Sequence, residues 1–122
     1  MSSFLLNITF DCANPRAQAG FWSAVTGYPA SDQSQPGNPF WLVGPPAGET
    51  RPRLVFVPVR ESKHAKNRVH LDIVPADRSQ SAELDRLTGL GASVIEDRRQ
   101  VEGGGWVVLA DPEGNEFCLE GD

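Results

Sequence analysis

The sequence predicts an α+β fold built from two tandem modules, each with the order strand, helix, strand, strand, strand. Two observations predict it. The 122 residues suit one domain, yet the same order of strand, helix and glycine is met twice along the chain. Residues 7–15 (NITFDCANP) also align with residues 68–76 (RVHLDIVPA), the start of RVHLDIVPAD, at an offset of 61, half the chain. We therefore expect one domain over 1–122, with module one over about 1–60 and module two over about 67–122.

The first module has local signals for most of its elements. Apolar and polar residues alternate over residues 5–12, as in a half-buried strand. Asn14-Pro15 then provides a helix N-cap followed by a proline at the first helical position, and Gly27 ends the helix. The stretch from 28 to 52 is rich in Gly, Pro, Ser and Gln, and its apolar island 40–43 predicts a strand between loops. Residues 53–59 (RLVFVPV) are β-branched and aromatic, and predict another strand.

The second module begins after a charged connector over residues 61–67. Alternation over 68–74 predicts a strand with Val69 on the side that its helix covers. The other elements expected here are a helix from about 79 to 90, a hairpin of 93–96 and 106–110 around the glycines that follow Glu102, and a last strand over 116–120.

Charge and cysteine content limit the classes of function. Lys and Arg total 11 against 16 Asp and Glu, so the net charge is −5. This balance argues against nucleic-acid and membrane-surface partners, which need clustered basic residues. No apolar run is long enough to span a membrane, and the N-terminus lacks the basic region of a signal peptide. Cys12 and Cys118 are no disulfide framework at this length, so we expect free thiols and a cytoplasmic location, with a bridge between them as the alternative.

The two module-opening strands predict a small-molecule cavity. Each places apolar residues beneath its helix and polar residues on the opposite face, namely Asn7, Thr9 and Asp11 in one module and Arg68, His70 and Asp72 in the other. A sheet with helices on one face must expose or enclose the other. A polar face edged by Trp41, Phe56 and Trp106 suits an enclosed site, where apolar walls supply area and a few polar groups supply specificity.

Three segments carry a resemblance to a known family: Phe21-Trp22, residues 67–72 (NRVHLD) and residues 106–115 (WVVLADPEGN). With the paired β-α-β-β-β order they resemble the vicinal oxygen chelate superfamily, which contains glyoxalase I, extradiol dioxygenases, fosfomycin-resistance enzymes and bleomycin-resistance proteins. The last two segments look most like its small bacterial glyoxalase-like branch. The resemblance covers almost the whole chain and implies a cupped mixed sheet with helices on its outer face. Modules of this superfamily pair within a chain or across a dimer, and we expect a homodimer.

The resemblance also implies where a metal would bind. In metal-dependent members each module supplies two ligands, usually His or Gln and Glu, from its first and last strands. Those positions fall on Thr9 and His70 in the first strands, and within residues 55–57 and on Cys118, four after Gly114, in the last strands. Only His70 is of the typical residue type, so we expect a metal-free cavity and no cofactor. A divalent metal held by His70, Cys118 and Glu120 is the alternative.

Three hypotheses for function follow. The first is a glyoxalase-like small-molecule-binding protein with a degenerate metal site, which sequesters a drug or metabolite. The second is a metal-independent lyase or isomerase that uses His70, the best catalytic candidate, as acid/base. The third is a domain with a vestigial cup that acts through dimerisation or contacts with other proteins. The expected ligand-binding residues are Thr9, Trp41, Phe56, His70, Trp106 and Cys118. Cys118 also suits a small buried position, and Asp11 and Asp72 suit strand–helix turns.

Overall fold

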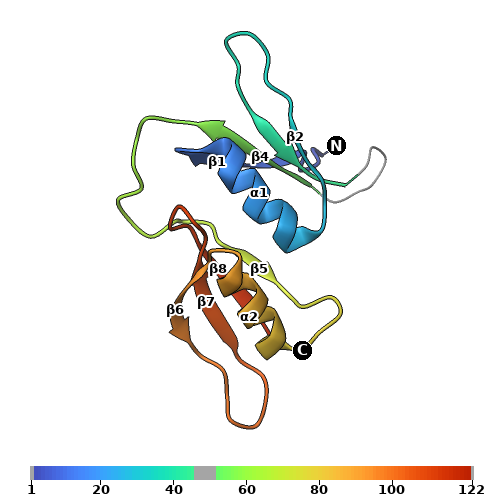
Figure 1. The fold of residues 1–122 in the computed structure, drawn as a ribbon, viewed down its shortest axis with the longest axis vertical. Helices are drawn as coiled ribbons and strands as arrows, with labels where there is room; N and C mark the ends of the chain where they lie inside the picture. The colour runs from blue at the N-terminus through green and yellow to red at the C-terminus, as the bar shows by residue number, and fades with distance from the viewer. Residues whose placement is uncertain (1, 46–51, 122) are drawn as a thin grey trace. The chain divides into compact units, whose positions relative to one another are not determined.

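A computed structural model describes residues 2–45 and 52–121, and divides between Ser62 and Lys63 into two compact units. Each unit holds one helix and one four-stranded mixed sheet, as Figure 1 shows. This arrangement confirms the predicted α+β fold of two β-α-β-β-β modules. Neither helix of the described chain has the length and apolar composition that would cross a membrane.

Unit one carries its helix on a sheet of strand order β1-β4-β3-β2. Its elements are β1 (Asn7–Cys12), α1 (Pro15–Thr26), β2 (Ala30–Asp32), β3 (Trp41–Val43) and β4 (Arg53–Pro58). Strands β1 and β4 are parallel, whereas β3 pairs antiparallel with both β4 and β2. Strand β2 had no sequence signal, because its three residues lie in the stretch rich in Gly, Pro and Ser and become a strand only by pairing with β3.

Helix α1 begins and ends where the sequence predicts. The Asn14 side chain accepts a hydrogen bond from the Ala17 N–H at 3.1 Å, and Pro15 opens the helix. At the other end Gly27 adopts φ 78° and donates its N–H to the Ser23 carbonyl at 2.8 Å. A positive φ is easily adopted only by glycine, which explains the stop at this position.

Aromatic rings fill the space between α1 and the sheet. The Phe10 ring lies 5.5 Å from Trp22 of α1 and 5.0 Å from Phe56 of β4, measured between centroids. Phe56 is 0 % exposed. Successive strand residues point to opposite faces, so the neighbours of Phe10 and Phe56 along their strands face away from the helix.

Unit two repeats the plan with strand order β5-β8-β7-β6. Its elements are β5 (Leu71–Ile73), α2 (Gln80–Gly89), β6 (Ser93–Asp97), β7 (Trp106–Ala110) and β8 (Glu116–Glu120). Its core is made of fully buried side chains from α2, β7 and β8, namely Leu87, Val107, Leu109, Phe117 and Leu119. The turn before β8 is closed by Asp111, whose side chain accepts the N–H groups of Glu113 and Asn115.

The opening strand of unit two is shorter than predicted. Strand β5 covers only Leu71–Ile73, and Val69, expected beneath the helix, is 74 % exposed. The reason lies in Asn67, whose side-chain amide donates to the carbonyls of Val69 (2.7 Å) and Glu116 (3.0 Å) and accepts the Glu116 N–H (3.0 Å). These bonds occupy backbone groups of Glu116 that a longer parallel strand would use, so residues 68–70 leave the sheet.

Candidate functional site

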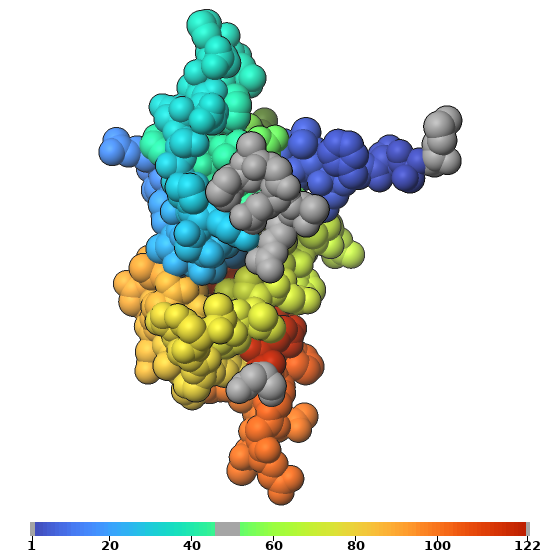
Figure 2. All heavy atoms as spheres, turned by 90° about the vertical axis from the view of Figure 1, so that its right-hand side faces the viewer, coloured from blue at the N-terminus to red at the C-terminus, as the bar shows by residue number. Residues whose placement is uncertain are grey.

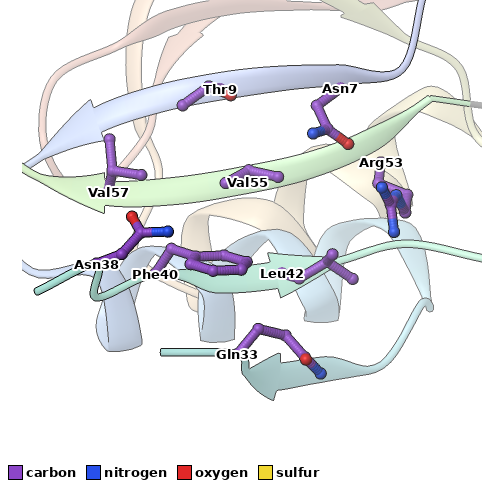
Figure 3. Close-up of a pocket in the computed structure, with 9 residues that line it drawn as sticks. All are labelled: Asn7, Thr9, Gln33, Asn38, Phe40, Leu42, Arg53, Val55 and Val57. Atoms are coloured by element: carbon purple, nitrogen blue, oxygen red, sulfur yellow. The ribbon is translucent and has the colours of Figure 1, made fainter. Parts of the chain in front are cut away.

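Unit one has a hollow of about 500 Å³ on the face of its sheet opposite α1 (Figure 3). The hollow is lined by alternate residues of β1 and β4, by one residue of β3, and by three residues of the β2–β3 connection. Its lining residues are Asn7, Thr9, Gln33, Asn38, Phe40, Leu42, Arg53, Val55 and Val57. Successive residues of a strand point to opposite faces of the sheet. Because Phe10 and Phe56 point toward α1, their neighbours Thr9 and Val55 point into the hollow.

Polar groups meet at one end of this hollow. Asn7 and Arg53 are register partners on the parallel strands β1 and β4, and Figure 3 shows their side chains at the same end. The Asn7 Oδ1 atom is buried and has no hydrogen-bond partner among the described residues. Arg53 is the one charged residue of the lining, and it forms no ion pair within residues 2–45 and 52–121. The hollow therefore offers a cation and a hydrogen-bond acceptor beside an apolar floor.

Of the residues expected around a ligand in the first module, Thr9 lines the hollow. Phe56 lies in the core against Phe10, and its register partner Trp41 shares that side of the sheet. The aromatic side chain that does line the hollow is Phe40. Sequence reasoning also missed Arg53, although its spacing of two from Val55 places both on one face of the strand.

Unit two brings together His70, Asp72 and Cys118. The His70 Nε2 and Asp72 Oδ1 atoms lie 3.2 Å apart, and one ligand atom of each of the three residues lies within 4.8 Å of the others. Asp72 and Cys118 are register partners on β5 and β8. The imidazole and the carboxylate are exposed, whereas Cys118 is 8 % exposed. His70 and Cys118 were expected at a site, but Asp72 was interpreted as a turn residue.

Two further predicted residues, Trp106 and Glu120, lie near this cluster. They are register partners on β7 and β8, and Glu120 shares a strand face with Cys118 two positions before it. The Arg98 guanidinium carbon lies 5.8 Å from the centre of the Trp106 ring. Glu120 is not part of the group whose ligand atoms lie within 4.8 Å of one another. Asp72, rather than Glu120, is thus the carboxylate that joins His70 and Cys118.

The surroundings of Cys118 hold its thiol in the protonated form. Burial raises the pKa of the Cys118 thiol, and the negative charges of Asp72 and Glu120 raise it further. A thiol is a weak nucleophile until it loses its proton. Neither Cys118 nor Cys12 takes part in a disulfide, and both are buried.

The donor set of the cluster only partly fits a metal. Imidazole, carboxylate and thiolate together suit a soft ion such as Zn²⁺ rather than Mg²⁺ or Mn²⁺. Closed zinc sites have four protein ligands, and a thiol must lose its proton before it binds. The described part of unit two offers three donors, two of which already bond to each other. At the corresponding positions of unit one, Val57 has no donor atom and Thr9 is a poor ligand.

Comparison with known proteins gives one family and many similar folds. A family model described as a glyoxalase-like domain matches residues 7–120. A glyoxalase/bleomycin resistance protein/dioxygenase superfamily member from Sphaerobacter thermophilus shares 15 % identity at a TM-score of 0.69, covering 99 % of this chain and 98 % of its own. A glyoxalase-related enzyme from Fulvimarina pelagi shares 16 % identity at 0.65, covering 95 % and 86 %.

A third similar structure includes a metal and a small molecule. It is a variant of the fosfomycin resistance protein FosX from Listeria monocytogenes, complexed with Mn(II) and a dihydroxypropylphosphonic acid. It shares 17 % identity at a TM-score of 0.69 and covers 98 % of this chain and 90 % of its own. At such identities the likeness shows the fold. No curated protein sequence matches the chain at a significant level.

Proposed function

Since the chain belongs to the glyoxalase-like domain family, we propose that it binds a small organic molecule in the hollow of unit one without help from a metal. The observation that carries this proposal is the hollow itself, at about 500 Å³. Ligand sites usually measure roughly 300–1,000 Å³ and combine apolar walls with a few placed polar groups. The function that follows is sequestration, in which a drug or metabolite is bound and released unchanged.

The side chains that line the hollow support ligand binding rather than a purely structural role for this face of the sheet. Leu42 and Val55 are antiparallel register partners whose side chains form the floor. Val55 is buried among its neighbours, so the floor is packed rather than loose. Thr9 and Asn38 add hydroxyl and amide groups at the rim. A ligand would thus find a preformed apolar surface and a small number of hydrogen-bonding groups, which favours one orientation.

A second candidate function is metal-independent acid/base catalysis at His70, as a lyase or isomerase. The observation that favours it is the 3.2 Å separation of His70 Nε2 and Asp72 Oδ1. A carboxylate in this position holds an imidazole in one orientation, as a general acid or base requires. We also propose that Trp106 and Cys118 contact a ligand of unit two. Both lie with Asp72 on one face of the sheet, and the buried Phe117 and Leu119 lie on the other.

We propose a homodimer in the cytoplasm as the working form of the protein. The segment before β1 bears three exposed apolar residues, Phe4, Leu5 and Leu6, at 85 %, 65 % and 56 % exposure. Figure 2 shows this dark-blue segment extending away from the rest of unit one. Burying such residues against a second copy would be favourable. Light scattering should give twice the chain mass of 13.2 kDa, and a monomeric mass would contradict the dimer.

The experiment that tests ligand binding uses the neutral probe 2-naphthamide, which joins an apolar bicycle to an amide. Titrated into ¹⁵N-labelled protein, it should shift the amide signals of Thr9, Val55 and Val57. Val55→Trp fills the hollow and should abolish these shifts. Val94→Trp, on an exposed position of β6, should leave them intact. Absence of shifts in the native chain would contradict the proposal.

The fate of a bound molecule separates the two functions, provided that the molecule has a bond that a lyase or isomerase can rearrange. 2-Naphthamide has no such bond and should be recovered unchanged under either function. A panel of 2-oxoaldehyde hemithioacetals, which an acid/base group can isomerise to 2-hydroxy thioesters without an oxidant, therefore extends the test by ¹H NMR. Turnover that is lost in His70→Ala and kept in His64→Ala would favour the acid/base enzyme.

A further inference from the structure

We infer that the hollow of unit one selects a small organic anion, with its carboxylate at the Asn7–Arg53 end and its apolar body over Leu42 and Val55. This inference rests on the proposed function, because it names the class of molecule that the same hollow takes. Four features of the described residues carry it.

The first feature is the sign of the charge in the hollow. The chain has 16 acidic and 11 basic residues, yet the nine lining residues include Arg53 and no Asp or Glu. No carboxylate within residues 2–45 and 52–121 forms an ion pair with Arg53. The planar guanidinium matches a carboxylate with two parallel hydrogen bonds. The described residues give Arg53 no negatively charged partner in an ion pair. An anionic ligand would supply that negative charge.

The second feature is the way Gly44 holds the stem of Arg53. A Cβ atom on Gly44 would lie 2.6 Å from Arg53 Cγ and 2.9 Å from Arg53 Cβ. The arginine stem therefore packs directly on the glycine backbone that follows β3. A long side chain that is already restrained loses less conformational entropy when it binds a ligand.

The third feature is the buried oxygen of Asn7. The Asn7 Oδ1 atom accepts no hydrogen bond from the described residues, and a buried acceptor left in this state is costly. Asn7 is the register partner of Arg53, and both side chains lie at one end of the hollow in Figure 3. A ligand with an N–H or O–H group next to its carboxylate would satisfy both residues together.

The fourth feature is the apolar surface that continues from this polar end. Phe40, Leu42 and Val55 line the same hollow, and Phe40 lies toward the end opposite Arg53 in Figure 3. Contact with these side chains would remove apolar ligand surface from water, which favours binding. A purely polar anion such as phosphate would leave this surface exposed. The combination therefore favours an organic acid with an aromatic or aliphatic body.

The test compares two probes of nearly equal shape, 2-naphthoate and 2-naphthamide, by isothermal titration calorimetry on the full chain at low salt. The acid should bind about tenfold more tightly than the amide, as expected for a charge-assisted hydrogen bond. Arg53→Met keeps the aliphatic stem and should bring the two affinities together. Arg16→Met removes an exposed charge from α1 and should keep the preference. Added salt should reduce the preference in the native chain.

The outcomes separate the selection of anions from the binding function on which it rests. Equal binding of the two probes would overturn the selection of anions while the binding function stands. Binding of neither probe would contradict the binding function itself. A loss of preference in Arg16→Met as large as in Arg53→Met would assign the effect to net charge and overturn the role of Arg53. Far-UV circular dichroism and ¹⁵N spectra verify that each variant is folded.

Discussion

Asp72 and Cys118 face each other across the parallel strands β5 and β8, as Asp11 and Val57 do across β1 and β4. Each member of the second-unit pair stands 61 positions after its counterpart, so both pairs keep the register of one ancestral module. The chemistry has nevertheless diverged. Val57 contributes to the apolar lining of a hollow, whereas Cys118 shares a cluster with a carboxylate and an imidazole.

The reactivity of Cys118 follows from this pairing. Burial and the charge of Asp72 raise the pKa of the thiol, so little thiolate is present near neutral pH. Asp72→Asn removes the charge, lowers the thiol pKa and should speed alkylation by iodoacetamide at about pH 8 by roughly threefold to tenfold. The measurement is mass spectrometry in a Cys12→Ser background, where Cys118 is the remaining thiol. Asp85→Asn, on α2, serves as the control and should leave the alkylation rate unchanged. An equal alkylation rate in Asp72→Asn and in the protein that keeps Asp72 would contradict the prediction.

The elements predicted correctly are those with signals inside their own residues. Helix α1 has its cap at Asn14 and its stop at Gly27, and β8 is bounded by the 111–115 turn. Strand β2 and the late start of β5 depend instead on distant partners. Residues 30–32 need β3, and residues 68–70 leave the sheet because Asn67 bonds to Glu116. No local pattern contains that information.

The site was harder to predict than the fold because strand β4 is apolar on both faces. Alternation reveals which face is buried only when the other face is polar. The run Leu54-Val55-Phe56 has no such contrast, so Phe56 was expected at the ligand although it packs beneath α1. Thr9 could be assigned to the face opposite Phe10 because β1 does alternate, and it lines the hollow. The pairing of Thr9 with Val55 is the information that would have identified the floor of the hollow.

Metal content is a direct test of the degenerate site. His70, Asp72 and Cys118 offer three donors, and the raised pKa of the Cys118 thiol opposes the loss of the proton that metal binding requires. We expect protein dialysed at about pH 7 to retain zinc well below one equivalent, measured by inductively coupled plasma mass spectrometry. One equivalent that disappears in His70→Ala and persists in His64→Ala would contradict this expectation and support a metal centre.

Gly44 should act as a positioning residue for Arg53. Gly44→Ala places a methyl group 2.6 Å from Arg53 Cγ, so the arginine stem must move. We expect the preference for 2-naphthoate over 2-naphthamide to fall about threefold or more, measured by the same calorimetry. Gly20→Ala, where an added Cβ meets no atom within 4 Å, should keep the preference. A preference retained in folded Gly44→Ala would show that Arg53 is not held by this contact.

The buried Glu83 of α2 should make stability depend on pH. Arg86 donates to its two carboxylate oxygens at 2.6 and 2.8 Å, and these bonds hold the Glu83 pKa below its usual value. A carboxyl whose pKa is lower in the folded state stabilises the protein above its unfolded pKa, and this contribution is lost as pH falls through the folded pKa. Glu83→Gln should thus cost about 1–2 kcal/mol at pH 7 and much less near pH 3.

Urea unfolding of native and Glu83→Gln protein at the two pH values measures this difference. Glu102→Gln, at the exposed tip of the β6–β7 hairpin, provides the control and should change stability little at either pH. A cost for Glu83→Gln that is the same at both pH values would assign the effect to packing rather than to the ion pair.

Two glycines at the base of the β6–β7 hairpin allow the cost of a left-handed backbone to be measured separately from the cost of a steric clash. Gly104 and Gly105 have nearly equal φ angles of 81° and 82°, but only a Cβ on Gly105 would meet other atoms, overlapping the Arg98 carbonyl oxygen and lying 2.9 Å from Arg99 Cα. The Gly105 carbonyl also accepts hydrogen bonds from the Gly121 N–H and the Gln80 side chain. Gly104→Ala should cost about 1 kcal/mol, the penalty of a left-handed conformation.

Gly105→Ala should cost clearly more, roughly 3 kcal/mol, because backbone atoms of the facing strand cannot rotate away as a side chain would. Urea unfolding at pH 7 measures both variants against the native chain. Equal losses would mean that the strands separate at little cost to admit the methyl group. A larger loss for Gly105→Ala would instead show that the backbone of residues 98–100 is held rigidly at this close approach.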